Sequence, residues 1–166
     1  VSDGPFHNFA GNNGQTYTSF CIMADNSLWL GDSEGFISLL NPEDGSLESH
    51  NLFAHSPATT SRKLSMLSPS PSSANIYVAF EHDDVKIFNV LSKTYQDLNI
   101  QEKNQLTILI NCFLEKNQKE LWIGTDSGLF ISDLDLGTCK RIRQDPLDPY
   151  ALSSHFVSAL FKDRED

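Results

Sequence analysis

The sequence predicts an all-β fold, a β-propeller fragment of about three four-stranded antiparallel blades with partial strands at both ends. Three observations predict it. An apolar motif with two glycines occurs at 121–130 and, in weaker form, twice upstream. Each copy divides into four short strand-like runs. Apolar residues follow a period of 2 better than the 3.6 of a helix. Four-stranded units of about 40 to 50 residues are typical of propeller blades.

The motif at 121–130 reads LWIGTDSGLF. An apolar run, a polar turn with glycine and a second apolar run are the pattern of two antiparallel strands joined by a tight turn. Taking Trp122 as the reference, Trp29 holds the equivalent place in a close copy and Tyr77 in a loose copy. The copies are spaced by roughly 45 residues, which is the length of one blade.

Each copy is expected to contain four strands separated by turns rich in Asp, Asn, Gly and Ser. The expected strands are 18–24, 28–31, 36–40 and 47–53 in the first copy, 64–67, 75–80, 85–90 and 95–100 in the second, and 107–114, 121–125, 129–132 and 139–143 in the third. Between the first two strands of the second copy, 68–73 is predicted to be a long mobile loop, because Pro69 and Pro71 do not fit a central strand. The inner runs are almost continuously apolar, so we expect the first strands to be the most buried and the fourth strands the most exposed.

The chain is predicted to be one partial propeller domain over residues 1–166. Its blades cover approximately 17–53, 62–100 and 106–143, and 156–166 is expected to be the first strand of a further blade. The segment 6–9 resembles a fourth strand with no blade ahead of it. Three blades cannot close a ring of about four to eight, so we expect a piece of a longer propeller that self-associates through its open blade edges.

Composition excludes some classes of function. The 166 residues include 22 acidic and 12 basic side chains, a formal charge of −10, which argues against a nucleic-acid partner. The basic cluster Lys140, Arg141 and Arg143 is interpreted as a solvated strand face. No apolar stretch reaches the roughly 18 to 20 residues of a membrane span, and the first residues do not resemble a signal peptide. These observations leave two alternatives open, a cytoplasmic protein or a mature piece without its targeting signals.

The three cysteines, Cys21, Cys112 and Cys139, are odd in number and form no C-x-x-C pair. They imply neither a disulfide framework nor a reactive site, and we interpret them as buried free thiols.

Other residue patterns could carry chemistry, and each has a simpler structural explanation. Trp29, Tyr77 and Trp122 could stack on sugars, but recurrence at one place in every copy favours packing between blades. The run 133–137, from Asp133 to Gly137, faintly resembles a calcium loop without its bidentate glutamate. Two further groups offer too few metal ligands, namely Glu81, His82, Asp83 and Asp84, and the pair His50 and His55. We therefore predict no catalytic residue, metal site or cofactor, and the sequence does not identify ligand-binding residues. Any ligand is expected at loops at one end of the propeller axis.

The segment 121–129, followed by Asp133 and Gly137, resembles the two-component regulator propeller repeat. The run 144–157 (QDPLDPYALSSHFV), with 162–165 after it, resembles the connector to the next blade of that family. The match is fair over 17–45 and weak in the middle copy, where Ala79 replaces the first glycine. The resemblance implies the periplasmic sensor region of hybrid two-component system proteins, histidine kinase and response regulator in one chain, of polysaccharide-degrading gut bacteria.

The resemblance implies a parent protein with a membrane segment, a histidine kinase, a receiver and a DNA-binding output domain. This chain has no phosphoacceptor helix and no ATP-binding glycine motif, so it is not expected to be an enzyme. Its expected partners are an oligosaccharide ligand and the remainder of its own propeller, with the membrane reached only through the parent. Two alternatives stay open. One is a propeller domain of a secreted carbohydrate-active enzyme. The other is a protein-interaction scaffold of the tryptophan–aspartate repeat kind, which the missing Gly-His and Trp-Asp pairs disfavour.

Overall fold

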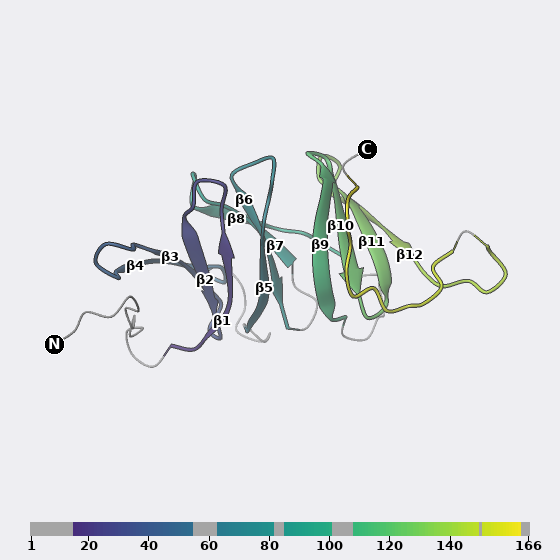
Figure 1. Cartoon of the computed structure of the whole chain (residues 1–166), viewed down its shortest axis with the longest axis horizontal. Coiled ribbons are helices and arrows are strands. Elements are labelled where there is room, and N and C mark those ends of the chain that lie inside the picture. The colour runs from purple at the N-terminus through teal and green to yellow at the C-terminus, as the bar shows by residue number, and fades with distance from the viewer. Residues whose placement is uncertain (1–14, 55–62, 82–84, 101–107, 150, 164–166) are drawn as a thin grey trace.

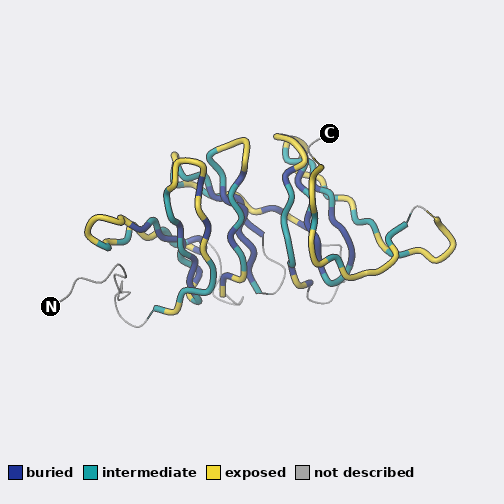
Figure 2. The backbone as a smooth tube through the Cα atoms, in the orientation of Figure 1, coloured by how far each residue is buried: buried dark blue, intermediate teal, exposed yellow. Residues whose placement is uncertain are grey.

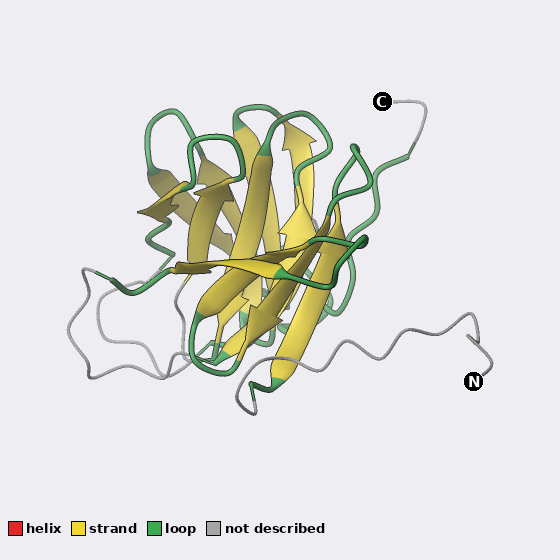
Figure 3. Ribbon diagram, turned by 90° about the vertical axis from the view of Figure 1, so that its left-hand side faces the viewer, coloured by secondary structure: helices red, strands yellow, loops and turns green. Residues whose placement is uncertain are grey.

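The structure is a computed structural model that describes residues 15–54, 63–81, 85–100, 108–149 and 151–163. Within these residues it consists of three four-stranded antiparallel sheets and contains no helix (Figures 1 and 3). We call the sheets blades 1, 2 and 3. Blade 1 contains β1 (Tyr17–Ile22), β2 (Leu28–Asp32), β3 (Phe36–Leu40) and β4 (Leu47–Asn51); blade 2 contains β5 (Leu64–Pro69), β6 (Asn75–Phe80), β7 (Val85–Asn89) and β8 (Thr94–Asp97); blade 3 contains β9 (Ile110–Asn117), β10 (Glu120–Thr125), β11 (Gly128–Asp133) and β12 (Thr138–Ile142).

Each blade is a simple meander in which every strand pairs with the next one along the chain. The blades stand side by side along the molecule, and their first strands, β1, β5 and β9, contact one another in turn (Figure 1). Among the described residues, the third and fourth strands of different blades do not approach one another as the first strands do. Sheets that meet at their first strands and diverge outward have the radial arrangement that the repeats predict.

Two apolar cores hold the three blades together. Alternate residues of β6 point to opposite faces of its sheet, so Ile76, Val78 and Phe80 pack in the core shared with blade 1, while Tyr77 and Ala79 pack in the core shared with blade 3. A strand buried on both faces reads as a continuous apolar run. This explains why every residue of β6 after Asn75 is apolar or aromatic.

The gradient of burial differs from the prediction in one respect (Figure 2). The fourth strands are exposed, as predicted, but the second and third strands are more buried than the first strands. The reason is that a first strand is an edge of its sheet and pairs on one side only. In β1, Phe20 and Ile22 are 67% and 57% exposed.

Several predicted boundaries are wrong, including that of the first strand of blade 3, which is predicted at 107–114 and is Ile110–Asn117. β5 continues through Pro69, which pairs with Ile76, so the loop comprises only 70–74, and its first residue, Ser70, is buried. Proline is tolerated there because β5 is an edge strand, whose outward side needs no N–H donor. The fourth strands of blades 1 and 2 end at Asn51 and Asp97, earlier than predicted. The predicted strand at 6–9 lies outside the described residues.

The segment 156–161 is not assigned as a strand, contrary to the prediction, because it has no strand partner among the described residues. It nevertheless lies on blade 3 much as β5 lies on blade 1. Thr18 Oγ1 donates to the carbonyl of Leu64, and Asn111 Nδ2 donates to the carbonyl of Val157 at 3.1 Å, with the same sequence separation of 46 residues. The segment therefore occupies the place of a first strand next to blade 3.

Glycine is required where these segments dock. A Cβ atom on Gly124 would lie 2.5 Å from Cys112 Sγ and 2.8 Å from Val157 Cγ1. The equivalent atom on Gly31 would lie 2.6 Å from Leu64 Cδ1. Real Cβ contacts are longer than this, so a Cβ atom would force the facing side chains to shift, Leu64 at Gly31 and Cys112 and Val157 at Gly124.

We expect Gly124→Ala to destabilise the protein by about 1–3 kcal/mol through overpacking, and to speed alkylation of Cys112 by loosening 156–161. Gly137→Ala is the control, since its Cβ would meet no atom within 4 Å and only its φ of +63° is unfavourable. That strain costs about 1 kcal/mol and should leave Cys112 unchanged. Denaturant unfolding and alkylation followed by mass spectrometry measure both effects. Equal alkylation rates in the two variants would contradict the docking geometry.

Candidate functional site

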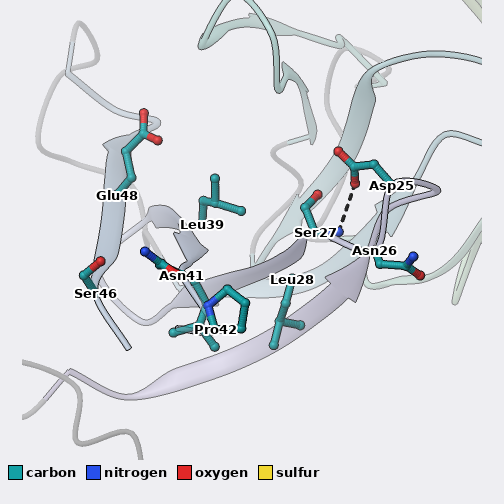
Figure 4. Close-up of a pocket in the computed structure, with 10 residues that line it drawn as sticks. Asp25, Asn26, Ser27, Leu28, Leu39, Asn41, Pro42, Ser46 and Glu48 are labelled. Carbon is teal, nitrogen blue, oxygen red and sulfur yellow. Dashed lines mark hydrogen bonds between the residues drawn. The ribbon is translucent and has the colours of Figure 1, made fainter. Parts of the chain in front are cut away.

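A cavity of ligand-binding size lies in blade 1, between the β1–β2 turn and the β3–β4 turn (Figure 4). Its volume is about 590 Å³, which is within the range of roughly 300–1,000 Å³ that ligand sites occupy. The cavity is lined by Asp25, Asn26, Ser27, Leu28, Leu39, Leu40, Asn41, Pro42, Ser46 and Glu48. We call it the blade 1 cavity.

Turn chemistry fixes the polar rim of this cavity. Asp25 accepts a hydrogen bond from the backbone N–H of Ser27 at 2.9 Å, drawn dashed in Figure 4. Hydrogen bonds from Ser27 hold the pKa of the Asp25 carboxyl below its ordinary value, so this exposed group is a carboxylate. Across the cavity, Asn41 accepts from the N–H of Glu43 at 2.9 Å. Both are side chains that hydrogen-bond their own backbone two residues on, the standard device for a rigid polar turn.

A smaller cavity of about 270 Å³ lies in blade 2, between β6, β7 and β8. It is lined by Asn75, Ile87, Asn89, Ser92, Thr94, Tyr95 and Gln96. Its amides and hydroxyls bond to one another, as when Asn89 Nδ2 donates to Asn75 Oδ1 at 2.9 Å and the hydroxyls of Ser92 and Thr94 lie 2.7 Å apart. These internal bonds leave it the weaker candidate for a ligand.

A buried carboxylate joins blades 2 and 3. Glu115 of β9 accepts hydrogen bonds from Ser70 Oγ at 2.5 Å, from Tyr77 OH at 2.8 Å and from Ser72 Oγ. Burial raises the pKa of the Tyr77 phenol, and its hydrogen bond to Glu115 adds to the shift. Tyr77 therefore stays protonated and acts as a donor. All three donors to the Glu115 carboxylate are hydroxyl groups of blade 2, and none is a basic side chain. The cluster therefore links blade 2 to blade 3.

The recurring aromatic residues pack between blades. Trp29 is fully buried against Phe88 of blade 2, with ring centroids 5.4 Å apart. Tyr77 is buried toward blade 3, where its ring lies 5.9 Å from that of Phe113. Trp122 is partly exposed; its Nε1 donates to Glu120 at 2.6 Å, and Lys116 lies over its ring. Packing is thus what the structure shows for Trp29 and Tyr77.

The histidine and carboxylate patterns do not assemble into a metal site. His50 packs against Trp29 and Phe88, with Nε2 3.2 Å from a Glu48 carboxylate oxygen but without hydrogen-bond geometry. His55 and the stretch 82–84 lie outside the described residues, so neither predicted group can be placed in full. Among the described residues, no group of three or more His, Cys, Asp and Glu side chains is arranged to hold a metal ion.

The remaining sequence candidates serve local structure. Asp133 caps its own turn by accepting from the N–H groups of Asp135 and Leu136, and Asp135 pairs with Lys119 at 2.6 Å. The side chain of Arg141 donates to the carbonyl of Ser127 at 2.8 Å and lies over the ring of Phe130. The calcium-like loop is therefore a turn, and this part of the basic cluster braces the β10–β11 turn.

Cys21 is buried, as predicted, whereas Cys112 and Cys139 are only partly buried, contrary to the prediction. Burial raises the pKa of the Cys21 thiol from 9.0 to about 12. We expect Cys21 to resist alkylation at about pH 9, because only a thiolate reacts, and to react once the protein unfolds. The same shift makes folding less favourable as pH rises from 9 toward 12, since the unfolded thiol loses its proton first. Peptide mass spectrometry after timed alkylation measures this, and rapid labelling of Cys21 in the folded protein would contradict its burial.

Sequence comparison finds no matching protein-family model and no matching curated protein. Solved structures do match. An extracellular domain assigned to the hybrid two-component system BT4673 of B. thetaiotaomicron aligns with a TM-score of 0.72 and 18% identity, over 90% of this chain and 19% of its own. The corresponding domain of BT3049 from the same organism aligns with a TM-score of 0.63 and 14% identity, over 86% of this chain and 20% of its own. Virginiamycin B lyase from Staphylococcus aureus aligns with a TM-score of 0.63 and 12% identity, over 81% of this chain and 43% of its own.

The chain has a β-propeller fold. This confirms the predicted fold class, a propeller fragment of about three blades. The chain spans about a fifth of each B. thetaiotaomicron domain, 19% of one and 20% of the other. In the described part of the propeller, no helix is long and apolar enough to cross a membrane.

Sequence reasoning missed both polar features. The blade 1 cavity has one signal in the sequence, Pro42, which stands where the other copies have Val90 and Leu134. The Glu115 cluster has no comparable signal, because its members lie up to 45 residues apart and are brought together only when two blades pack.

Proposed function

We propose that this chain is part of the periplasmic sensor domain of a hybrid two-component signal-transduction protein. The observation that carries the proposal is its likeness to the extracellular domain of BT4673 over 90% of the chain, at a TM-score of 0.72. The motif at 121–130 supports it independently, because its resemblance to the two-component regulator repeat concerns sequence and not fold.

In this role the chain binds a carbohydrate and passes the signal to a kinase outside it. The blades are suited to this task, because Trp29 and Tyr77 lock each sheet to the next while the turns project from a rigid scaffold. Binding at a turn then biases how neighbouring blades pack. Transmission needs no catalytic group in the chain itself.

Two experiments test the proposal. The gene that encodes the chain should also encode a membrane segment followed by a histidine kinase, and a gene without them would overturn it. The full-length protein should bind an oligosaccharide and leave it intact when the mixture is followed by chromatography.

The competing proposal is that the chain belongs to an enzyme, and the likeness to virginiamycin B lyase is the reason to test it. A propeller domain of a secreted carbohydrate-active enzyme would release shorter products from the bound glycan. Cleavage by the full-length protein at a rate that depends on enzyme concentration would favour this second function over sensing.

The exposed face of blade 1 supports a further partner for the chain, the remainder of its own propeller. Phe20 and Ile22 of β1 project from this face, and both are large apolar side chains more than half exposed. A neighbouring blade would cover them, and a second copy would do so when the chain is studied alone. Sedimentation of the isolated chain should show self-association, and a stable monomer at high concentration would argue against it.

A further inference from the structure

We propose that the blade 1 cavity is a binding site for a neutral oligosaccharide. This inference rests on the proposed sensor function and assigns its ligand contact to the two turns 25–27 and 41–46. The reasons are the backbone feature that holds the cavity open, its absence from the other blades, and the chemistry of the lining.

Pro42 holds the cavity open by removing a backbone hydrogen bond. In blade 2, the N–H of Val90 donates to the carbonyl of Ala74 at 2.8 Å, and this bond ties the β7–β8 turn to the β5–β6 loop. In blade 3, the N–H of Leu134 donates to the carbonyl of Lys119 at 2.7 Å in the same way. Pro42 stands at this place in blade 1 and has no N–H.

The equivalence of these positions follows from the turns themselves. Each of the three residues comes directly after an Asn or Asp whose carbonyl accepts the N–H of the residue four further on, at 2.9 Å in every blade. The donors of those closing bonds are Gly45, Lys93 and Gly137, and all three have positive φ. The same turn therefore occurs in all three blades. At the residue after the Asn or Asp, blade 1 alone lacks a backbone N–H, because that residue is Pro42.

Without this bond the two turns of blade 1 separate. Pairing between β2 and β3 ends at Leu28 and Leu40, and Figure 4 shows the open space between Asp25 on one turn and Ser46 on the other. In blade 3 the same space is closed twice, by the Leu134 hydrogen bond and by the ion pair of Lys119 with Asp135. Blade 2, whose Val90 hydrogen bond is intact, holds only the cavity of about 270 Å³ at the equivalent place, so the larger volume of about 590 Å³ is particular to blade 1.

The lining matches a polyhydroxylated and uncharged ligand. Six polar side chains surround the cavity and offer hydroxyl, amide and carboxylate groups, which can donate to and accept from sugar hydroxyls: Asp25, Asn26, Ser27, Asn41, Ser46 and Glu48. Leu28, Leu39 and Pro42 give apolar surface for the C–H faces of a sugar ring. The lining therefore combines many hydrogen-bonding groups with a smaller apolar surface, as a sugar with its hydroxyls and C–H faces requires.

Charge selects among sugars. No Lys or Arg lines the cavity, while Asp25 and Glu48 do. Lys93 of the β7–β8 turn lies 3.6 Å from Glu48 and over the ring of Trp29. Uronic acids and phosphates would face the Asp25 carboxylate with no Lys or Arg in the cavity lining, and Lys93 is already paired with Glu48, which disfavours anionic ligands.

The test measures oligosaccharide binding by the full-length protein and three variants. The neutral probes are cellotetraose, maltotetraose, xylotetraose and mannotetraose, and tetragalacturonate is the anionic probe. Pro42→Val restores the missing N–H with the residue found at that place in blade 2. Ser46→Tyr blocks the rim at an exposed position. Thr138→Tyr is the matched control, because Thr138 pairs with Asp133 at the place that Ser46 holds beside Asn41.

We expect a neutral probe to bind the wild-type protein at least about tenfold more tightly than tetragalacturonate does. Ser46→Tyr and Pro42→Val should each weaken that binding at least about tenfold, whereas Thr138→Tyr should leave it unchanged. Circular dichroism checks that each variant folds, and Ser46→Tyr carries the test alone if Pro42→Val does not.

The unfavourable outcomes are distinguishable. A neutral probe that binds both cavity variants as tightly as wild type would overturn this site and leave the proposed sensor function standing. Equal loss in Thr138→Tyr would also overturn the site. Tighter binding of tetragalacturonate would refute the charge argument and with it the ligand class. Failure of every probe to bind the wild-type protein would overturn both the site and carbohydrate sensing.

Discussion

Replacing Trp29 with alanine is expected to lower the free energy of unfolding by about 3–5 kcal/mol. Trp29 is 1% exposed and fills the core between blades 1 and 2. Its ring meets Phe88 edge-on, Lys93 lies 4.8 Å above it, and its Nε1 donates to Ser27 at 3.2 Å. Truncation leaves a cavity that neighbouring side chains on two separate sheets cannot easily close, so the measured loss of stability should be close to this full range.

The control is Leu136→Ala, which removes an apolar side chain that is 74% exposed in a blade 3 turn. It should change stability by less than about 0.5 kcal/mol. Denaturant unfolding of both variants separates packing from ligand stacking for Trp29. A Trp29→Ala protein as stable as wild type that failed to bind sugar would mean that the ring is a binding platform, and our interpretation would be wrong.

The fold could be predicted from the sequence because its determinants are local and repeated. Trp29, Tyr77 and Trp122 mark the same strand in each copy, and the turn glycines Gly45 and Gly137 mark the same hairpin. Such signals depend on neighbouring residues and on the alternation of side chains along a strand. In the middle copy Lys93 adopts the left-handed conformation, with φ of +59°, at the place of those glycines. The turn persists there without its usual sequence signal.

The cavity and the Glu115 cluster could not be predicted in the same way. Pro42 is visible in the sequence, but its effect depends on which carbonyl lies across from it, and that requires the register between two strands. The serines and prolines of 68–73 predict a mobile loop, because both residue types favour turns. Its hydroxyls are held by Glu115, which belongs to another blade. Contacts between blades, unlike turns, leave no pattern in a single short segment.

Replacing Glu115 with alanine is expected to destabilise the protein by about 2–4 kcal/mol, because each buried donor left without an acceptor costs about 1–3 kcal/mol. Tyr77 is 2% exposed, so its hydroxyl cannot turn to bulk water, whereas the Ser70 hydroxyl still has Ser73 Oγ at 2.7 Å as a second partner. Glu115→Gln keeps one acceptor oxygen and should cost roughly half as much. Thermal and denaturant unfolding, read against wild type, give both values.

A double-mutant cycle with Tyr77→Phe separates the hydrogen bond from general disruption of the core. Tyr77→Phe alone should cost about 1–2 kcal/mol, since the phenol donates to a charged acceptor at 2.8 Å. In the Glu115→Ala background the same change should cost little, because the hydroxyl has already lost its acceptor. The expected coupling is at least about 1 kcal/mol. Strict additivity would mean that the two blades are joined by apolar packing alone and that the carboxylate does not link them.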